Sequence, residues 1–293
     1  MNVSILSLLF IVSTTLAISL RLKVPFDRPQ IFPNVYSIRA GYWNGIPNVQ
    51  TIAFVHMLDH NTSTGSFNSF AVTDCCAVLA DGARWKTTEG YTIDVGNEQG
   101  LSSSFITTAL SSATTAWDSQ LAFSLIGTQT VGSITTIDTS GPDGQNQIIF
   151  AVLNSESVIA VTYIHGTFGG SVSGRSIIEF DMIFNENFAF GDGASNKMDL
   201  QAIATHEFGH AFGLGHPDAV SACSETTMFP TASFGETKKR SLHADDIACI
   251  CNLYNDPNCG GGDSPGENAG NSGASASMLS ALWIGTLMFF LVY

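Results

Sequence analysis

The sequence feature that most constrains the fold is the segment HEFGHAFGLGH at residues 206–216. It fits the pattern H-E-x-x-H-x-x-G-x-x-H, which a chain of this length matches by chance on the order of once in ten thousand. Residues four apart share one face of a helix, so the imidazoles of His206 and His210 can bind one metal ion. Gly213 can take the left-handed conformation that ends a helix, which lets the chain return with His216 as third ligand.

The chemistry of these residue types points to a catalytic metal. Three protein ligands leave a fourth coordination position open, which is typical of a catalytic zinc ion rather than a structural one. Glu207, beside the first ligand, is placed to take a proton from a zinc-bound water as a general base. The alternative is that the three histidines are surface groups or hydrogen-bonded core groups.

The residues around the motif predict an amphipathic helix. Apolar side chains recur at steps of three and four, so one face would be buried while the histidine face looks into a cleft. The apolar residues are Leu200, Ala204, Phe208, Ala211 and Phe212. Asn196 or Asp199 is predicted to cap the start of this helix.

Together with Met228 in the segment TTMFP, the motif resembles the metzincin clan of metalloproteases, in which a methionine turn lies beneath the zinc. Within the clan, the chain most resembles the matrixins. The resemblance covers roughly residues 85–256 and includes DLQAIATHE at 199–207 and IEFDMIFN at 178–185. The last helix of the family is matched by Asp245, Asp246, Ile247, Ile250, Leu253 and Tyr254.

This resemblance implies an extracellular zinc endopeptidase that cuts protein or peptide substrates, with Glu207 as general base and Met228 forming the floor beneath the metal. It implies an α+β fold with a twisted, mostly parallel sheet, a long active-site helix and a C-terminal helix. Substrate is expected to lie extended along the strand near 177–184. The alternative is an inactive, surface-anchored adhesion or recognition module with a metalloprotease fold. Such modules usually lose the glutamate or a ligand, and all four are present here.

The resemblance also bears on further metal sites. The family's structural-zinc pattern begins with His-x-Asp, whereas His165 is followed by Gly-Thr, so a second zinc is not expected. Calcium is a second candidate cofactor, with Asp181, Asp192 or Glu186 as candidate ligands. Ordinary solvated carboxylates are the alternative for these three.

The cysteines point to an oxidising compartment. They leave open how an inactive precursor of the protein would be blocked. Six cysteines allow three bridges in several pairings: Cys75, Cys76, Cys223, Cys249, Cys251 and Cys259. Resemblance to related sequences favours a bridge between Cys223 and Cys251. Matrixin zymogens often block the zinc with the cysteine of a P-R-C-G-x-P-D segment, which is absent, and no cysteine switch is assigned. Cys75 and Cys76 are expected to form structural disulfides.

Both ends of the chain carry targeting signals. Residues 1–17 contain an apolar run that ends in small residues, which predicts a signal peptide; a buried strand is the alternative. Residues 278–293 carry no charge but fall short of the roughly twenty residues of a membrane span. With small residues around Asn268 and Asn271 as candidate attachment sites, they predict a glycolipid (GPI) anchor signal; a tail-anchored transmembrane segment is the alternative. Asn61 begins an N-glycosylation acceptor.

The net charge limits the partners of the protein, and the hydrophobic periodicity predicts its helices and strands. The net charge of −14, with only eleven lysines and arginines, argues against nucleic acid as a partner. A helix is predicted at 102–118, and strands at 91–95, 121–126, 147–153, 158–164 and 177–184. The predicted division is a signal peptide (1–17), an extension (18–85), a metalloprotease domain (86–256), a spacer (257–277) and a removed tail (278–293). The extension is a propeptide, an extra strand layer or both.

Overall fold

The computed structural model describes residues 30–32, 35–43, 46–59, 75–139, 141–217 and 221–259, all within one compact unit, Met1–Gly262. The predictions for residues 1–17, Asn61, Asn268, Asn271 and the 278–293 tail fall outside these residues. Among the described residues, no helix has the length and apolar character needed to cross a membrane.

The strands are β1 (Gln30–Phe32), β2 (Val35–Trp43), β3 (Ile46–Leu58), β4 (Glu89–Ile93), β5 (Ile126–Val131), β6 (Gln147–Ala151), β7 (Val158–Thr167), β8 (Ser176–Asn185), β9 (Phe190–Gly191), β10 (Met198–Asp199) and β11 (Thr231–Ala232). The helices are α1 (Ser103–Asp118), α2 (Leu200–Ala211) and α3 (Ala244–Tyr254), with short 3-10 turns at η1 (Leu79–Asp81), η2 (Val172–Gly174), η3 (Ser221–Cys223) and η4 (Lys238–Arg240).

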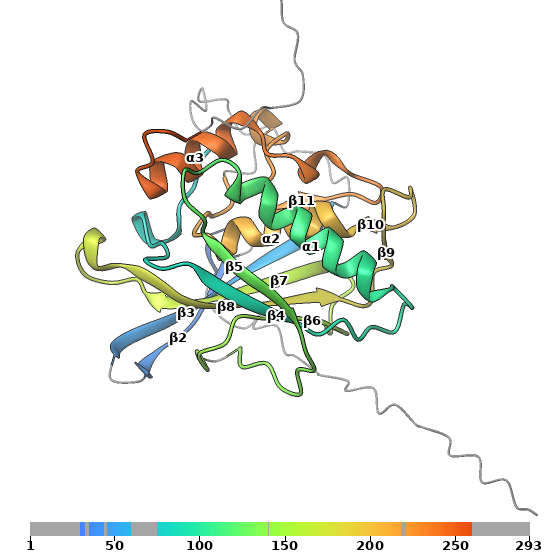
Figure 1. Ribbon diagram of the computed structural model, residues 1–293, viewed down its shortest axis with the longest axis horizontal. Helices are drawn as coiled ribbons and strands as arrows, with labels where there is room; N and C mark the ends of the chain where they lie inside the picture. Colours follow the sequence, from blue (N-terminus) through green and yellow to red (C-terminus); the bar gives the residue numbers. More distant parts are fainter. Residues whose placement is uncertain are drawn as a thin grey trace, which may run out of the picture. The chain divides into compact units, whose positions relative to one another are not determined.

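Nine strands form one sheet in the order β1-β2-β3-β7-β8-β6-β4-β5, with β11 pairing β3 beside this path (Figure 1). The pairs β8/β6, β6/β4 and β4/β5 are parallel, as expected for strands joined by long crossovers. The pairs β1/β2, β2/β3, β3/β7 and β7/β8 are antiparallel. The α+β class is confirmed, but the sheet is mixed rather than mostly parallel because residues 30–58 add antiparallel strands to it.

Helices α1 and α2 cover one face of the sheet (Figure 1). Ser102 caps α1 by accepting a hydrogen bond from the Phe105 amide, and Asp199 caps α2 by accepting one from the Ala202 amide at 2.8 Å. The predicted cap at Asp199 is therefore confirmed. Trp117 of α1 is fully buried, and its indole donates to a backbone oxygen of α2 at 2.7 Å. This contact fixes the active helix against its neighbour.

The residues predicted to form the buried face of α2 are all in the core. However, the opposite face is buried as well, since His206, Glu207 and His210 are each 0% exposed. The histidine face of α2 therefore does not open directly to solvent, because strand β3 lies over it. On the other face of the sheet, a second apolar cluster includes Ala53, Val55 and Ile137.

The sulfur pairing differs from the prediction. Cys223 pairs with Cys75, and Cys251 pairs with Cys259, so the predicted Cys223–Cys251 bridge is wrong. Cys76 pairs with Cys249, which makes both upstream cysteines structural, as expected. The physical reason is a backbone contact that the sequence does not reveal. The segment after the cysteines runs beside the end of the active helix, with an antiparallel bridge between residues 78 and 214.

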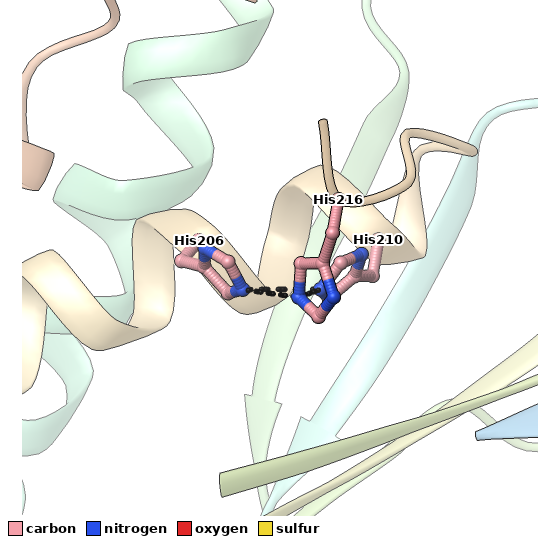
Figure 2. A group of neighbouring side chains, drawn as sticks. All are labelled: His206, His210 and His216. Atoms are coloured by element: carbon pink, nitrogen blue, oxygen red, sulfur yellow. Dashed lines mark hydrogen bonds between the residues drawn. The ribbon is translucent and has the colours of Figure 1, made fainter. Parts of the chain in front are cut away.

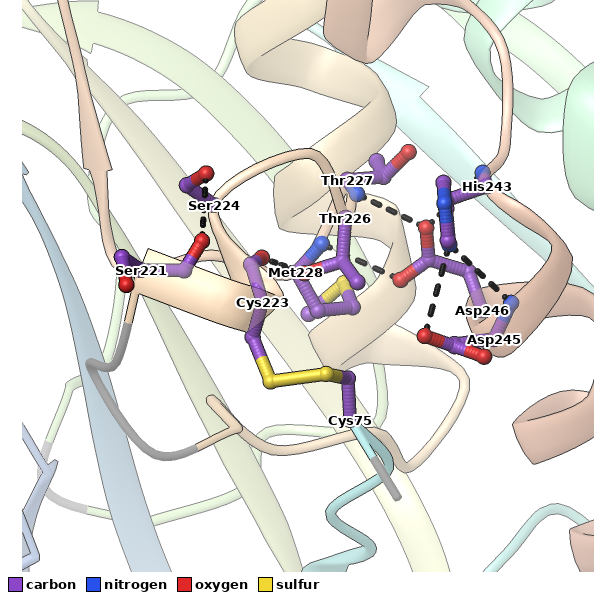
Figure 3. The surroundings of a disulfide bond; sticks show 10 residues. All are labelled: Cys75, Ser221, Cys223, Ser224, Thr226, Thr227, Met228, His243, Asp245 and Asp246. Atoms are coloured by element: carbon purple, nitrogen blue, oxygen red, sulfur yellow. Dashed lines mark hydrogen bonds and ion pairs between the residues drawn. A yellow bond between two sulfur atoms is a disulfide. The ribbon is translucent and has the colours of Figure 1, made fainter. Parts of the chain in front are cut away.

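The two adjacent cysteines then reach different targets. Neighbouring side chains of an extended segment point to opposite sides. Cys75 therefore reaches the loop after the third histidine, as Figure 3 shows, while Cys76 reaches α3. The remaining bridge spans only 8 residues at the end of α3, where Asn255 takes a left-handed conformation and turns the chain back.

Candidate active site

The three predicted histidine ligands meet at one point. Their Nε2 atoms lie 3.1 Å (His206–His216), 3.1 Å (His206–His210) and 3.0 Å (His210–His216) apart (Figure 2). A tetrahedral zinc ion with Zn–N bonds of about 2.0–2.1 Å holds its nitrogens about 3.3 Å apart, so the triangle nearly matches that spacing. His206 and His210 come from α2, and His216 comes from the loop that follows it.

The other ring nitrogens support the same interpretation. Nδ1 of His206 lies 2.7 Å from the Thr227 carbonyl oxygen, and Nδ1 of His210 lies 2.9 Å from that of Leu214. A carbonyl only accepts hydrogen bonds, so each Nδ1 carries the proton and each Nε2 keeps its lone pair for a metal. Burial lowers the pKa of both histidines well below the usual value, which keeps the rings neutral. The residues present therefore fit a zinc ion.

Glu207 lies beside this triangle and is completely buried. Its Oε2 accepts a hydrogen bond from the Thr162 hydroxyl at 2.5 Å, while Oε1 has no hydrogen-bond partner among the described residues. Burial raises the pKa of Glu207 to about 8, against the opposing effects of the Thr162 hydrogen bond and the charge of Lys239. Thr162 thus fixes one oxygen, and the other lies 3.2 Å from Nδ1 of His56.

Met228 packs against the active helix. It is 2% exposed, and a Cβ added at Gly209 in the middle of α2 would clash with its sulfur. The missing side chain at Gly209 therefore allows the close contact. Lys239, also buried, donates from Nζ to the carbonyl oxygens of Thr227 (3.0 Å) and Phe229 (2.6 Å) on either side of Met228. Burial lowers the pKa of Lys239 to about 7.

A buried carboxylate holds the turn at Met228. Asp246 accepts from the amides of Thr227 (2.7 Å), Met228 (3.2 Å) and His243 (3.0 Å), as Figure 3 shows for the first two. We expect Asp246→Ala to lower the free energy of unfolding by about 2–4 kcal/mol, because three amides lose a charged acceptor. The half-exposed Asp245 is the control, and Asp245→Ala should change stability by less than about 0.5 kcal/mol. Urea unfolding measures both, and similar losses would contradict the role of Asp246.

Gly213 turns the chain between the helix and the third ligand. Its φ is +99°, and a Cβ there would lie 2.6 Å from the Ala83 carbonyl oxygen. We expect Gly213→Ala to destabilise the protein by about 1–3 kcal/mol and to weaken zinc binding by displacing His216. Two controls separate the causes. Gly100 has a positive φ, and a Cβ there would meet no other atom, so Gly100→Ala measures the backbone strain alone. Gly169 has no positive φ and equally open surroundings, so Gly169→Ala measures the loss of a glycine alone. If all three variants unfold at the same denaturant concentration, the turn does not need glycine.

The strand expected to line the cleft is in a different place. Strand β8, which contains residues 177–184, is paired on one edge with β7 and on the other with β6. An extended substrate therefore has no free edge along β8, and that expectation is wrong. Strand β7 contributes Thr162 to the site, and it is itself paired with β3, whose Phe54 and His56 stack on two of the ligands.

The carboxylates predicted as calcium ligands are separated. Asp192 pairs with Arg240, which also binds the cap residue Asp199, and Glu186 accepts from the Glu98 amide at 2.6 Å. Asp181 lies buried on β8 with Glu179 and His165, whose Nε2 is 3.4 Å from Asp181. These last three form a second group of ligand-bearing side chains. Because it contains an imidazole, it is not the all-oxygen set that calcium prefers.

Four residues of the site were not singled out by the sequence: Phe54, His56, Thr162 and Lys239. Phe54 stacks on His210 with ring centroids 4.1 Å apart, and His56 stacks on His206 at 3.7 Å. The contacts of Phe54, His56 and Thr162 join residues far apart in the chain, whereas those of Lys239 reach residues 10 and 12 positions away; none of the four belongs to a motif. Strand alternation in β3 is the only signal that places Phe54 and His56 on one face.

Comparison with known proteins gives an independent test. Residues 84–255 match the family model described as matrixin. Metalloendoproteinase 5-MMP of Arabidopsis thaliana is 40% identical over 81 residues, 27% of this chain and 21% of that protein. Human matrilysin is 36% identical over 74 residues, 25% of this chain and 26% of that protein. Human matrix metalloproteinase-19 is 35% identical over 99 residues, 32% of this chain and 18% of that protein.

These alignments cover only about a quarter or less of each relative's length. The family model, in contrast, spans more than half of this chain and includes the three histidines, Glu207 and Met228. With the geometry of the histidine triangle, it establishes that the chain belongs to the matrixin family.

Proposed function

We propose that the protein is a zinc endopeptidase that hydrolyses peptide bonds in protein substrates. The observation that carries the proposal is the triangle of Nε2 atoms 3.0–3.1 Å apart with a buried carboxylate next to it. Three imidazole nitrogens are the donor set of a catalytic zinc site, and the carboxylate beside them, which is not a ligand, is placed to act as general base. The name matrilysin or metalloendoproteinase on the relatives supports the same activity.

The roles of the residues follow from their contacts. A zinc ion held by His206, His210 and His216 would supply a Lewis acid that polarises the scissile carbonyl and acidifies a water. Glu207 then takes a proton on Oε1, the oxygen not engaged by Thr162, and passes it to the leaving amine. Burial raises the pKa of Glu207, so its carboxylate is a stronger base than an exposed glutamate and can accept a proton and pass it on.

The disulfides indicate where the enzyme works. Three bridges with no free cysteine among the described residues are typical of an oxidising, extracellular environment. We further propose secretion through a signal peptide at 1–17 and attachment to the cell surface by a glycolipid at Asn268 or Asn271. These two assignments depend on sequence patterns alone. Release of the protein from intact cells by a phosphatidylinositol-specific phospholipase tests the anchor, and no release would reject it.

Metal analysis combined with proteolysis tests the enzymatic proposal. Purified protein should contain one zinc per chain and degrade casein, should lose both properties with a chelator, and should regain both when zinc is added back. Zinc retained by a protein that hydrolyses nothing in any form would instead favour the adhesion or recognition module. Loss of zinc without any effect on hydrolysis would reject a zinc mechanism.

A further inference from the structure

A cavity of about 310 Å³ lies against the C-terminal end of the active helix. Two of the residues that line it bind that helix end: the Trp85 indole donates to the Ala211 carbonyl oxygen (2.7 Å), and the Tyr254 hydroxyl donates to that of Phe212 (2.9 Å). None of the residues of the active site described above lines this cavity. The cavity is therefore attached to the helix that carries two of the zinc ligands but is separate from the catalytic centre.

Part of the cavity wall is aromatic and open to solvent. The rings of Phe123 and Tyr254 lie with their centroids 6.0 Å apart and their planes tilted by 58°. Phe123 is 45% exposed, in the connection between α1 and β5, while Trp85 and Leu125 line the cavity as buried residues. An exposed aromatic ring leaves water only when another group covers it, so this wall favours a ligand with an aromatic or large apolar side chain.

Two basic side chains from the segment before β4, Arg84 and Lys86, also line the cavity. Neither forms an ion pair with a carboxylate in the part of the chain that the structure describes, whereas Arg175, Lys238 and Arg240 each do. Partial desolvation of the Lys86 ammonium and the positive charge of Arg84 both lower the pKa of Lys86. The two cations thus destabilise each other, and an anion bound beside them would relieve that repulsion.

The hydroxyl groups that line the cavity already donate their protons within the protein. Thr88 donates to the Ser124 carbonyl oxygen at 2.8 Å, Thr87 donates to the carboxylate of Glu89, and the Ser124 hydroxyl donates to that of Asp118. Toward a ligand these hydroxyl oxygens can only accept. The cavity therefore offers cations for a carboxylate and oxygens for amide N–H groups, and an acidic peptide supplies both.

We propose that this cavity is a second binding site for protein substrates, which takes an acidic segment with an aromatic or large apolar side chain next to a carboxylate. Arg84 and Lys86 bind the carboxylate, and Phe123 and Tyr254 contact the apolar side chain. Because the protein carries a net charge of −14, its surface as a whole repels acidic chains, and the two unpaired cations set the place where such a chain binds. This proposal rests on the proposed endopeptidase function and adds the class of substrate.

The test measures binding of a synthetic peptide to the full, zinc-loaded chain carrying Glu207→Gln, in which cleavage of the probe is slow. The probe is a short fluorescent peptide that alternates glutamate with phenylalanine. One control peptide has glutamine in place of each glutamate, and the other has alanine in place of each phenylalanine. We expect the probe to bind at least about tenfold more tightly than either control. Its affinity should fall as salt rises from about 0.05 M to about 0.5 M. Equal binding of all three peptides would overturn the proposal.

Variants of the protein place the binding in the cavity. Arg84→Gln with Lys86→Gln should weaken binding of the probe by at least about tenfold, and Phe123→Ser should weaken it as well. The matched control, Lys197→Gln with Lys238→Gln, removes the same net charge outside the cavity and should change the affinity by less than about twofold. Circular dichroism verifies that all variants are folded. Equal losses in the two double variants would show a general effect of charge and reject the cavity as the site.

A sulfated oligosaccharide tests the other kind of polymer that two cations suit. A heparin fragment is added to the wild type, to the double variant at Arg84 and Lys86, and to Phe123→Ser. We expect it to bind more weakly than the probe, because it has no aromatic side chain for Phe123. Binding of the fragment that depends on Arg84 and Lys86, with no binding of the acidic peptide, would overturn the assignment of a peptide ligand.

Hydrolysis kinetics separates this proposal from the enzymatic one. In otherwise unchanged protein, Arg84→Gln with Lys86→Gln should raise KM for casein, an acidic protein, by about fivefold or more without changing kcat, and should not affect hydrolysis of a short uncharged peptide. Probe binding that depends on Arg84 and Lys86, in a protein that hydrolyses nothing, would support the cavity and reject the endopeptidase. Casein hydrolysis with the same KM in both proteins, and no binding of the probe, would support the endopeptidase and reject the cavity.

Discussion

Glu207→Gln should lower peptide hydrolysis by about 10²- to 10⁴-fold while the protein keeps its zinc. Glutamine has nearly the same shape and can still meet Thr162, but its amide cannot take the proton that Oε1 accepts. Zinc retention follows because Glu207 is not among the three nitrogen donors. Hydrolysis and zinc content are measured on variant and wild type together, under the same conditions.

The matched control removes a carboxylate elsewhere. Glu225 is 67% exposed and pairs with Lys238 at 3.1 Å, so Glu225→Gln should leave both hydrolysis and zinc content unchanged. Undiminished hydrolysis by Glu207→Gln would remove the general base from the mechanism. Loss of zinc in that variant would mean that the carboxylate binds the metal.

The active helix could be predicted because its information is local. The histidines four apart, the apolar residues at steps of three and four, the cap at Asp199 and the turn at Gly213 are all encoded within a short segment. Each of these features acts on neighbours in sequence, so the helix end and the ligand positions follow directly. Helix α1, with its regular burial pattern, was predictable for the same reason.

The strand at the sheet edge was placed wrongly because its signal is weak. A strand was predicted at 121–126, whereas β5 spans Ile126–Val131. Leu121 and Leu125 are buried, but they pack from the connection after α1 rather than from a strand. The true strand, IGTQTV, is largely polar and mostly exposed. An edge strand pairs with one neighbouring strand only, so its stability depends little on an alternation of apolar and polar side chains. Hydrophobic periodicity therefore does not locate it.

The main feature that the sequence concealed is the position of β3. No individual strand was predicted for the segment IAFVHML, and the strand that it joins depends on contacts more than a hundred residues away. Nothing near His56 distinguishes it from an ordinary core histidine. The same limit applies to the disulfides, since the proximity of Cys75 and Cys223 arises from backbone pairing after the active helix.

Removal of the Cys75–Cys223 bridge by a double change to alanine should lower the free energy of unfolding by about 3.5 kcal/mol in the chain-entropy account. Its cysteines are 148 residues apart, but the Cys76–Cys249 bridge remains and shortens the loop to about 27 residues, whereas Cys251–Cys259 closes a loop of 8. The corresponding double change at Cys251 and Cys259 should therefore cost only about 2.5 kcal/mol. Guanidinium unfolding of wild type and both variants under non-reducing conditions measures the difference.

The long bridge should also affect the metal site, which the short one should not. Cys223 lies between the third ligand, His216, and Met228, so the bridge holds the loop that carries the ligand toward the floor of the site (Figure 3). We expect weaker zinc binding in the variant without Cys75 and Cys223, measured by competition with a chelator in folded protein. Equal stability losses in the two variants would contradict the entropic account. Unchanged zinc affinity would show that the loop keeps its position through its backbone contacts alone.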